Sequence, residues 1–168
     1  MKYPVKINLE PLTSKAFAPY GYVIDTGERE PMDINEGTTK RFDNLCTADV
    51  NDLGGEAIVS IFRANPRAQP IVLKMMERHP LGSQAFMPLG QQQWIAVVSP
   101  AVKPSADTLK AFLVRGDQGL QYHKNVWHHP LLVINSQDFL VVDRKGKGKN
   151  LEEVWFDGGR FGEIDISV

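Results

Sequence analysis

The fold class is decided by the stretch Ile71-Val72-Leu73-Lys74-Met75-Met76-Glu77-Arg78-His79-Pro80-Leu81-Gly82-Ser83-Gln84-Ala85-Phe86-Met87. Two short apolar runs joined by a Pro- and Gly-containing segment are typical of consecutive β-strands. Because side chains alternate between faces along a strand, the odd-numbered residues of an unbroken strand 71–79 share one face. That face runs from Ile71 in the core to Glu77 and His79 at the strand end. Burying an ionisable pair without partners is costly, so either the pair has partners in the fold or it belongs to a functional site. A surface Glu-Arg-His run at the strand end is the alternative.

Further short runs rich in Val, Ile and Phe, bounded by Gly, Pro, Asn or Asp, predict more strands on both sides of this stretch. They cover residues 22–25, 57–63, 94–98, 109–114, 120–127, 131–134 and 139–143. One helical turn is expected at 14–18, and the polar segment 27–39 reads as a loop. The spacing suits antiparallel meanders in a sandwich or barrel rather than βαβ units. We therefore predict an all-β fold with minor helices.

Composition limits the functional classes. A chain of 168 residues with 42% hydrophobic and 23% charged residues is expected to form one globular domain. The net charge of −1 argues against nucleic acid or an anionic membrane as partner, since either favours a basic surface. Cys46 is the only cysteine, which excludes an intrachain disulfide and a Cys-based zinc site. No run approaches the ~20 apolar residues of a membrane span or has the form of a signal peptide, so we expect a cytoplasmic protein.

A second polar cluster is Tyr122-His123-Lys124-Asn125-Val126-Trp127-His128-His129-Pro130, which holds every histidine except His79. Histidine suits proton transfer near neutral pH and is a common metal ligand. His123 and His128 fall on opposite faces of an unbroken strand, but a turn or bulge around Asn125 would change this. His128 is expected at the mouth of the barrel and His129 at the surface.

These motifs resemble those of the ureidoglycolate lyases of allantoin breakdown. The resemblance is carried by Glu77-Arg78-His79-Pro80 with Gln84, Phe86 and Pro88, by Trp127-His128-His129-Pro130, and by earlier pieces at 18–21, 34–38 with Arg41, and 60–63. It implies a cupin-like double-stranded β-helix barrel as a single domain over residues 1–168. It also implies a homodimer and the cleavage of ureidoglycolate to glyoxylate and urea.

The comparison with metal-binding cupins also shows a departure. Such cupins present His-x-His, a following Glu and a later His. Here Glu77 stands at the first position and His79 at the second, while Gln84 replaces the Glu and His128 is the later His. Because an amide is a weaker ligand than a carboxylate, the resemblance implies a divalent ion, nickel or manganese, that is weakly bound or optional.

The substrate named by the resemblance has one carbon that bears a hydroxyl, a carboxylate and a ureido nitrogen. Breaking its C–N bond requires removal of the hydroxyl proton and protonation of the leaving nitrogen, without water or a redox centre. Glu77, His79 and His128 are candidates for this acid–base work. Which of them is acid and which is base stays open.

The substrate also needs groups that bind it. Arg63 and Arg41 are candidate carboxylate anchors, since guanidinium groups bind carboxylates in bidentate fashion. A surface salt bridge is the alternative for either arginine. Candidates for binding the ureido group are Asn35, Thr38, Gln84, Tyr122 and Lys124.

Three other classes of protein stay open at this point. A ureidoglycolate amidohydrolase would release ammonia, a metal cupin oxygenase would consume oxygen, and a non-catalytic cupin would bind a small acid without reaction. The first normally needs a dinuclear metal site and the second a His-x-His motif with a Glu, which the sequence does not show. Analysis of the products distinguishes all four.

Overall fold

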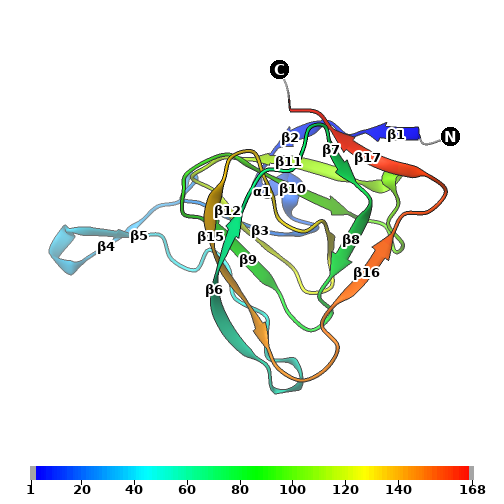
Figure 1. Cartoon of the computed structure of the whole chain (residues 1–168). Helices are drawn as coiled ribbons and strands as arrows, with labels where there is room; N and C mark the ends of the chain where they lie inside the picture. The colour runs from blue at the N-terminus through cyan, green and yellow to red at the C-terminus, as the bar shows by residue number, and fades with distance from the viewer. Residues whose placement is uncertain (1–2, 167–168) are drawn as a thin grey trace.

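The computed structural model describes residues 3–166 and is built mostly of β-strands (Figure 1). The first half holds β1 Tyr3–Lys6, β2 Leu9–Pro11, α1 Ser14–Phe17, β3 Gly21–Ile24, β4 Met32–Ile34, η1 Asn35–Gly37, β5 Thr39–Arg41, η2 Asp52–Gly54, β6 Glu56–Ala64, β7 Ile71–Leu73, β8 Met75–Arg78 and β9 Gln84–Pro88. The second half holds β10 Trp94–Ser99, η3 Ala106–Thr108, β11 Lys110–Val114, β12 Gly119–Tyr122, β13 Trp127–His128, β14 Leu132–Val133, β15 Gln137–Lys145, β16 Glu152–Trp155 and β17 Arg160–Ile164. This architecture confirms the predicted mostly antiparallel β fold with minor helices.

Two sheets enclose the main core. One has the order β16-β8-β13-β10-β11-β2, with β14 also pairing with β10, and the other has the order β3-β12-β9-β15-β6. Large aromatic side chains fill the space between them, among them Phe17, Phe86, Trp94, Phe112 and Phe139. Several of these rings meet edge to face, as Phe17 and Phe112 do at 5.7 Å. Polar residues on the inner faces of the same two sheets form the candidate site.

A third sheet, β1-β17-β7, covers the outer face of the first one and forms a second core. Strand β10 contributes Trp94, Ala96 and Val98 to the main core, and Ile95 and Val97 to the second. It is therefore buried along its whole length and lies in the middle of its sheet. Residues 94–98 therefore do not form an edge along which a second copy could pair.

The predicted strand 71–79 is broken at Lys74. Strand β7 pairs with β17, whereas β8 pairs with β13 and β16. The break shifts the alternation, so that Ile71 and Leu73 pack with Met76 in the second core rather than sharing a face with Glu77. The prediction of one continuous face is therefore wrong for the first half of the stretch.

Other differences from the predicted elements are local. The segment 27–39, expected to be a loop, contributes most of the hairpin β4–β5, which projects from the body of the molecule as an arm (Figure 1). The predicted strand 120–127 is divided into β12 and β13 by a turn in which Asn125 has a φ of 70°. This turn is the one that the histidine spacing required. Strands β16 and β17 were not predicted.

No helix in the described part of the chain has the length and hydropathy needed to cross a membrane.

Candidate functional site

The site is built from two rows of directly opposed residues on facing sheets. In one sheet, Glu77 on β8 lies opposite His128 on β13 and Glu153 on β16. His128 is also opposite Val98, which belongs to the main core, so this row faces inward. Directly opposed residues of antiparallel strands share a face, with Cβ atoms about 5 Å apart. The strand register therefore places a carboxylate beside an imidazole.

The second row belongs to the facing sheet and joins the first through a pair of stacked rings. Tyr122 on β12 lies opposite Gln84 on β9. The Tyr122 ring stacks on the His128 ring with centroids 4.2 Å apart and an angle of 12° between the planes. Gln84, Tyr122 and His128 are all buried. The two rows thus meet inside the barrel.

Glu77, His79 and His128 form the centre of the site. The Glu77 Oε1 atom lies 3.6 Å from His128 Nε2 and 3.9 Å from His79 Nε2. Each imidazole uses its other nitrogen on a backbone carbonyl, His79 Nδ1 with Asn150 O at 2.8 Å and His128 Nδ1 with Val126 O at 2.9 Å. Since a carbonyl only accepts, Nδ1 carries the proton in each neutral ring and Nε2 keeps a free lone pair.

These lone pairs have no partner within the described residues. His79 Nε2 and His128 Nε2 are both buried and form no hydrogen bond. Buried polar atoms are nearly always paired in native proteins. Two unpaired imidazole nitrogens that face one carboxylate therefore indicate a site for a ligand or a metal ion.

Two loops hold His79 in place. Its backbone carbonyl accepts a hydrogen bond from the backbone N–H of Asn125, at 2.8 Å, in the left-handed turn before β13. The Asn150 carbonyl fixes its ring, and the Asn150 side-chain oxygen accepts from the backbone N–H of Leu81 at 2.8 Å. Asn150 therefore orients both the imidazole and the loop that follows it.

Burial sets the protonation states at the site. Burial raises the pKa of Glu77, an effect that His79 opposes and Glu153 reinforces. Burial lowers the pKa of His128 to about 3, with His79 adding to the shift. Burial also raises the pKa of Tyr122, and the Glu77 charge acts in the same direction. At neutral pH the site therefore presents a neutral His128 and a neutral Tyr122 to a carboxylate that binds protons more readily than usual.

The cluster could hold a divalent metal ion. One ligand atom from each of Glu77, His79 and His128 lies within 4.8 Å of the others. The carbonyls on the two Nδ1 atoms are the outer partners that usually fix a metal-binding imidazole. Gln84, predicted as a fourth ligand, lies on the facing row, with its Oε1 atom buried and unpaired.

Two predicted substrate-binding residues carry other partners in this chain. Arg63 is on the outer face of β6, where its exposed side chain donates two hydrogen bonds to Asp138, at 2.9 and 3.1 Å. Lys124 pairs with Asp52 at 2.8 Å and with Asp49 at 3.4 Å. The structure does not bring either cation to the Glu77 cluster.

Three more predicted residues, Asn35, Thr38 and Arg41, belong to the projecting arm and its continuation. All three are exposed. Thr38 Oγ1 donates to the Asn35 carbonyl, and Arg41 pairs with Asp43 at 2.7 Å. Within one chain they stand apart from the cluster (Figure 1).

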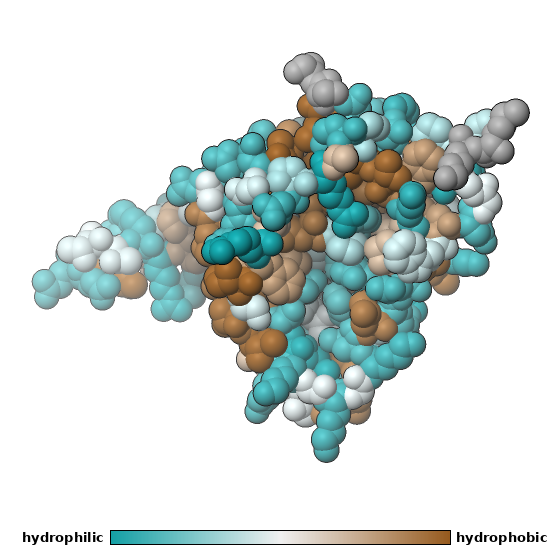
Figure 2. All heavy atoms as spheres, in the orientation of Figure 1, coloured by the Kyte–Doolittle hydropathy of each residue, from teal (hydrophilic) through white to brown (hydrophobic). Residues whose placement is uncertain are grey.

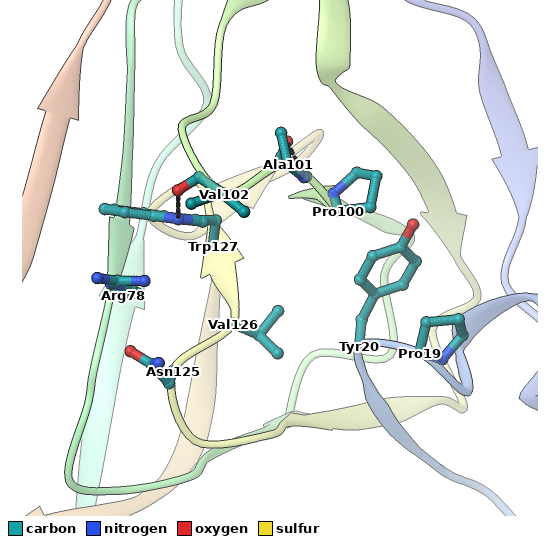
Figure 3. A pocket seen from close by; sticks show the side chains of 10 residues that line it. Pro19, Tyr20, Arg78, Pro100, Ala101, Val102, Asn125, Val126 and Trp127 are labelled. Atoms are coloured by element: carbon teal, nitrogen blue, oxygen red, sulfur yellow. Dashed lines mark hydrogen bonds between the residues drawn. The ribbon is translucent and has the colours of Figure 1, made fainter.

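A neighbouring surface pocket is separate from the site. It has a volume of about 370 Å³ and is lined by Tyr20, Val102, Asn125 and other residues (Figure 3). Arg78 and Trp127, which also line it, stack at 4.4 Å, and the Trp127 indole donates to the Val102 carbonyl. By alternation these two residues face away from Glu77 and His128. The pocket is therefore on the opposite face of β8 and β13.

Sequence reasoning missed several residues around the site. His129, expected at the surface, is buried, which lowers its pKa to about 4, so that prediction is wrong. Asp143, which accepts a hydrogen bond from Gln84, follows Phe139 and Val141 at alternate positions, a signal that could have placed it on the inner face. Asn150 and Glu153 have no such signal, because their strands and loops were not predicted.

The chain is similar to proteins of one family. A family model described as ureidoglycolate lyase matches residues 4–161. A Burkholderia mallei (strain NCTC 10229) protein named ureidoglycolate lyase is 50% identical over 148 residues, covering 88% of this chain and 87% of its own. Proteins of the same name from Pseudomonas fluorescens (strain Pf0-1) and Rhizobium etli (strain CIAT 652) are 47% and 45% identical, over 89% and 92% of this chain and 91% and 93% of theirs.

Proposed function

The chain belongs to the ureidoglycolate lyase family, and we propose that it cleaves ureidoglycolate to glyoxylate and urea at the cluster of Glu77, His79 and His128. The observation that carries the choice of site is the pair of buried, unpaired Nε2 atoms directed at one carboxylate.

The reaction moves a single proton. The hydroxyl oxygen of ureidoglycolate loses its proton and becomes the aldehyde oxygen of glyoxylate, while the C–N bond breaks and the nitrogen leaves with a proton as urea. No water, oxidant or further reactant enters the balance. One group that takes the proton from oxygen and returns it to nitrogen is sufficient.

Glu77 is the group best suited to carry this proton. Burial raises the pKa of Glu77, which makes its carboxylate a stronger base than an exposed glutamate. In the metal-free protein, His79 and His128 keep their Nε2 lone pairs towards the same space, where they accept hydrogen bonds from N–H groups of the substrate. Because the pKa of His128 is about 3, this ring stays neutral and does not compete with Glu77 for the proton.

We infer that the same three residues hold a divalent ion, and that Gln84, the fourth predicted ligand, is left to bind substrate. Two imidazole nitrogens favour nickel over manganese, because affinity rises in that direction for nitrogen ligands. When bound, the ion acts as a Lewis acid that lowers the pKa of the substrate hydroxyl. Calorimetric titration of chelator-treated protein with nickel tests this. We expect wild type and His123→Ala to bind nickel and His79→Ala not to bind it. Equal nickel binding by wild type and His79→Ala would contradict the assignment.

We also propose that the protein is a homodimer formed through the outer face of β6 and β15. Val59, Ile61 and Leu140 on that face are 66%, 54% and 36% exposed, and Ile61 lies directly opposite Leu140. Figure 2 shows hydrophobic side chains gathered over these strands, on the side of the molecule from which the arm projects. An isolated two-stranded hairpin such as the arm is marginally stable in water. This supports a second copy that packs against both the arm and the outer face of β6 and β15. Substrate binding by Asn35, Thr38 and Arg41 then depends on the arm of one copy reaching the site of the other.

Product analysis separates the lyase from the remaining classes. We expect urea and glyoxylate in equal amounts, and a lower rate, but not zero, in the presence of a chelator. Ammonia as the nitrogen product would indicate an amidohydrolase, oxygen uptake an oxygenase, and unchanged substrate a binding protein.

A further inference from the structure

The amide of Gln84 has a fixed orientation that acid–base chemistry alone does not require. Gln84 is 7% exposed, and its Nε2 atom donates to Asp143 Oδ2 at 3.2 Å. A carboxylate only accepts hydrogen bonds, so the amide nitrogen must face Asp143 and the oxygen must face the other way. That oxygen, Oε1, is buried and has no partner among the described residues.

The strand register places this acceptor on the inner face of the barrel. Ala85 and Val142 are directly opposed on β9 and β15, so Gln84 and Asp143 are the next pair along the two strands. Gln84 is also opposite Tyr122, whose ring stacks on His128. The unpaired oxygen thus belongs to the row that faces the Glu77 cluster.

We propose that Asp143 is a positioning residue that holds the Gln84 amide so that Oε1 accepts a hydrogen bond from the ureido N–H groups of the substrate. The inference rests on the proposed function and deepens it, since it names the group that recognises the ureido end. Without the Asp143 carboxylate the amide is free to rotate by 180° and present its N–H donors to the ureido donors. A ligand that lacks an N–H leaves the buried oxygen unpaired, which costs binding free energy and gives the site selectivity.

A double-mutant cycle separates positioning from a general structural role. Asp143→Ala should raise KM for ureidoglycolate about tenfold, the effect of one buried hydrogen bond, with kcat within about threefold. Asp143→Asn, whose amide oxygen can still accept from Gln84, should recover most of this loss. In a Gln84→Ala background, Asp143→Ala should have no further effect on KM, because the two residues act as one unit. Asp138→Ala, which removes a carboxylate from the outer face of the same strand, is the matched control.

Inhibitor binding gives a second measurement that survives poor folding of the Asp143→Ala variant. Oxamate carries an amide N–H and glyoxylate carries none. Gln84→Ala should weaken inhibition by oxamate about tenfold and leave inhibition by glyoxylate unchanged.

The inference is overturned if Asp143→Ala leaves KM unchanged, if it has the same effect in the Gln84→Ala background, or if both inhibitors weaken equally. A wild-type protein that releases no urea and glyoxylate contradicts the proposed function instead, so the two failures are distinguishable.

Discussion

At the scale of single residues, the site depends on which nitrogen of each imidazole carries the proton. The carbonyls of Asn150 and Val126 each accept a hydrogen bond from Nδ1–H, so in a neutral ring Nε2 meets Glu77 as an acceptor. His128, which burial keeps neutral, gives the half-buried Glu77 carboxylate no donor, which is unfavourable for folding but useful for binding a proton or a cation. The arrangement trades stability for function, as active sites commonly do.

This trade predicts how stability depends on pH at Glu77. Burial raises its pKa in the folded state, so the protonated form is favoured and the charged form is penalised on folding. The penalty is absent below the ordinary carboxyl pKa of 4.5 and is complete once the pH exceeds the folded-state value. In chelator-treated protein, Glu77→Gln should therefore raise the melting temperature by a few degrees at pH 7 and by almost nothing at pH 4. A stabilisation that is equal at both pH values would contradict the burial argument; Glu10→Gln at an exposed position is the control.

Single residues also show what could be predicted from sequence. Glu77 and His79 could be placed together from strand alternation, and His128 joined them once a turn at Asn125 was assumed. Asn150 could not be predicted, because it orients His79 through its backbone carbonyl, which any residue possesses. Arg63 was predicted to bind the substrate carboxylate, but its guanidinium donates to Asp138, the residue directly opposite it on β15.

At the scale of elements, the loops around the site are tied together by one buried arginine. Arg144 Nη2 donates to the carbonyls of Asp52 and Lys147, at 2.8 and 2.7 Å. A Cβ at Gly55 would lie 2.3 Å from Arg144 Nε. The guanidinium can therefore pack against this position only because residue 55 has no side chain.

Arg144→Leu should therefore destabilise the fold by about 2 kcal/mol, since the carbonyls of Asp52 and Lys147 lose the donor of the buried guanidinium. Urea denaturation measures this, with Lys145→Leu at the adjacent exposed position as the control. An unchanged unfolding free energy in Arg144→Leu would show that these loops are held by other contacts.

The elements that the sequence did not predict depend on partners distant along the chain. Lys74 lies inside an apolar run without Pro or Gly, so nothing local marks the break between β7 and β8. The break arises because β7 pairs with β17 and β8 with β16, two strands from the end of the chain. In β16, Val154 and Trp155 favour a strand but Glu152 and Glu153 do not, so the pairing with β8 decides the conformation.

At the scale of the whole molecule, the arm and the outer face of β6 predict a defined assembly. Among the described strands, β6 is an edge of nine residues that pairs only with β15. A long edge strand with exposed aliphatic residues tends to associate with another chain. Ile61→Asp places a charge in the proposed interface and should convert the dimer to an 18.8 kDa monomer in sedimentation equilibrium at micromolar concentration.

The control for this experiment is Val102→Asp, since Val102 is 93% exposed and lies outside the β6 and β15 strands. Wild-type protein that sediments only as a monomer would contradict the proposed dimer, as would an Ile61→Asp variant that remains dimeric.

The measurement that tests the central claim most directly follows the products in wild type and His79→Ala side by side. Wild type should release urea and glyoxylate one to one, without ammonia. His79→Ala should fold with a similar far-UV spectrum and lose about 10²-fold or more in turnover. His123→Ala should keep wild-type turnover, because the His123 ring meets Tyr22 edge to face, away from the cluster. Turnover of His79→Ala close to that of wild type, or release of ammonia by wild type, would contradict the account.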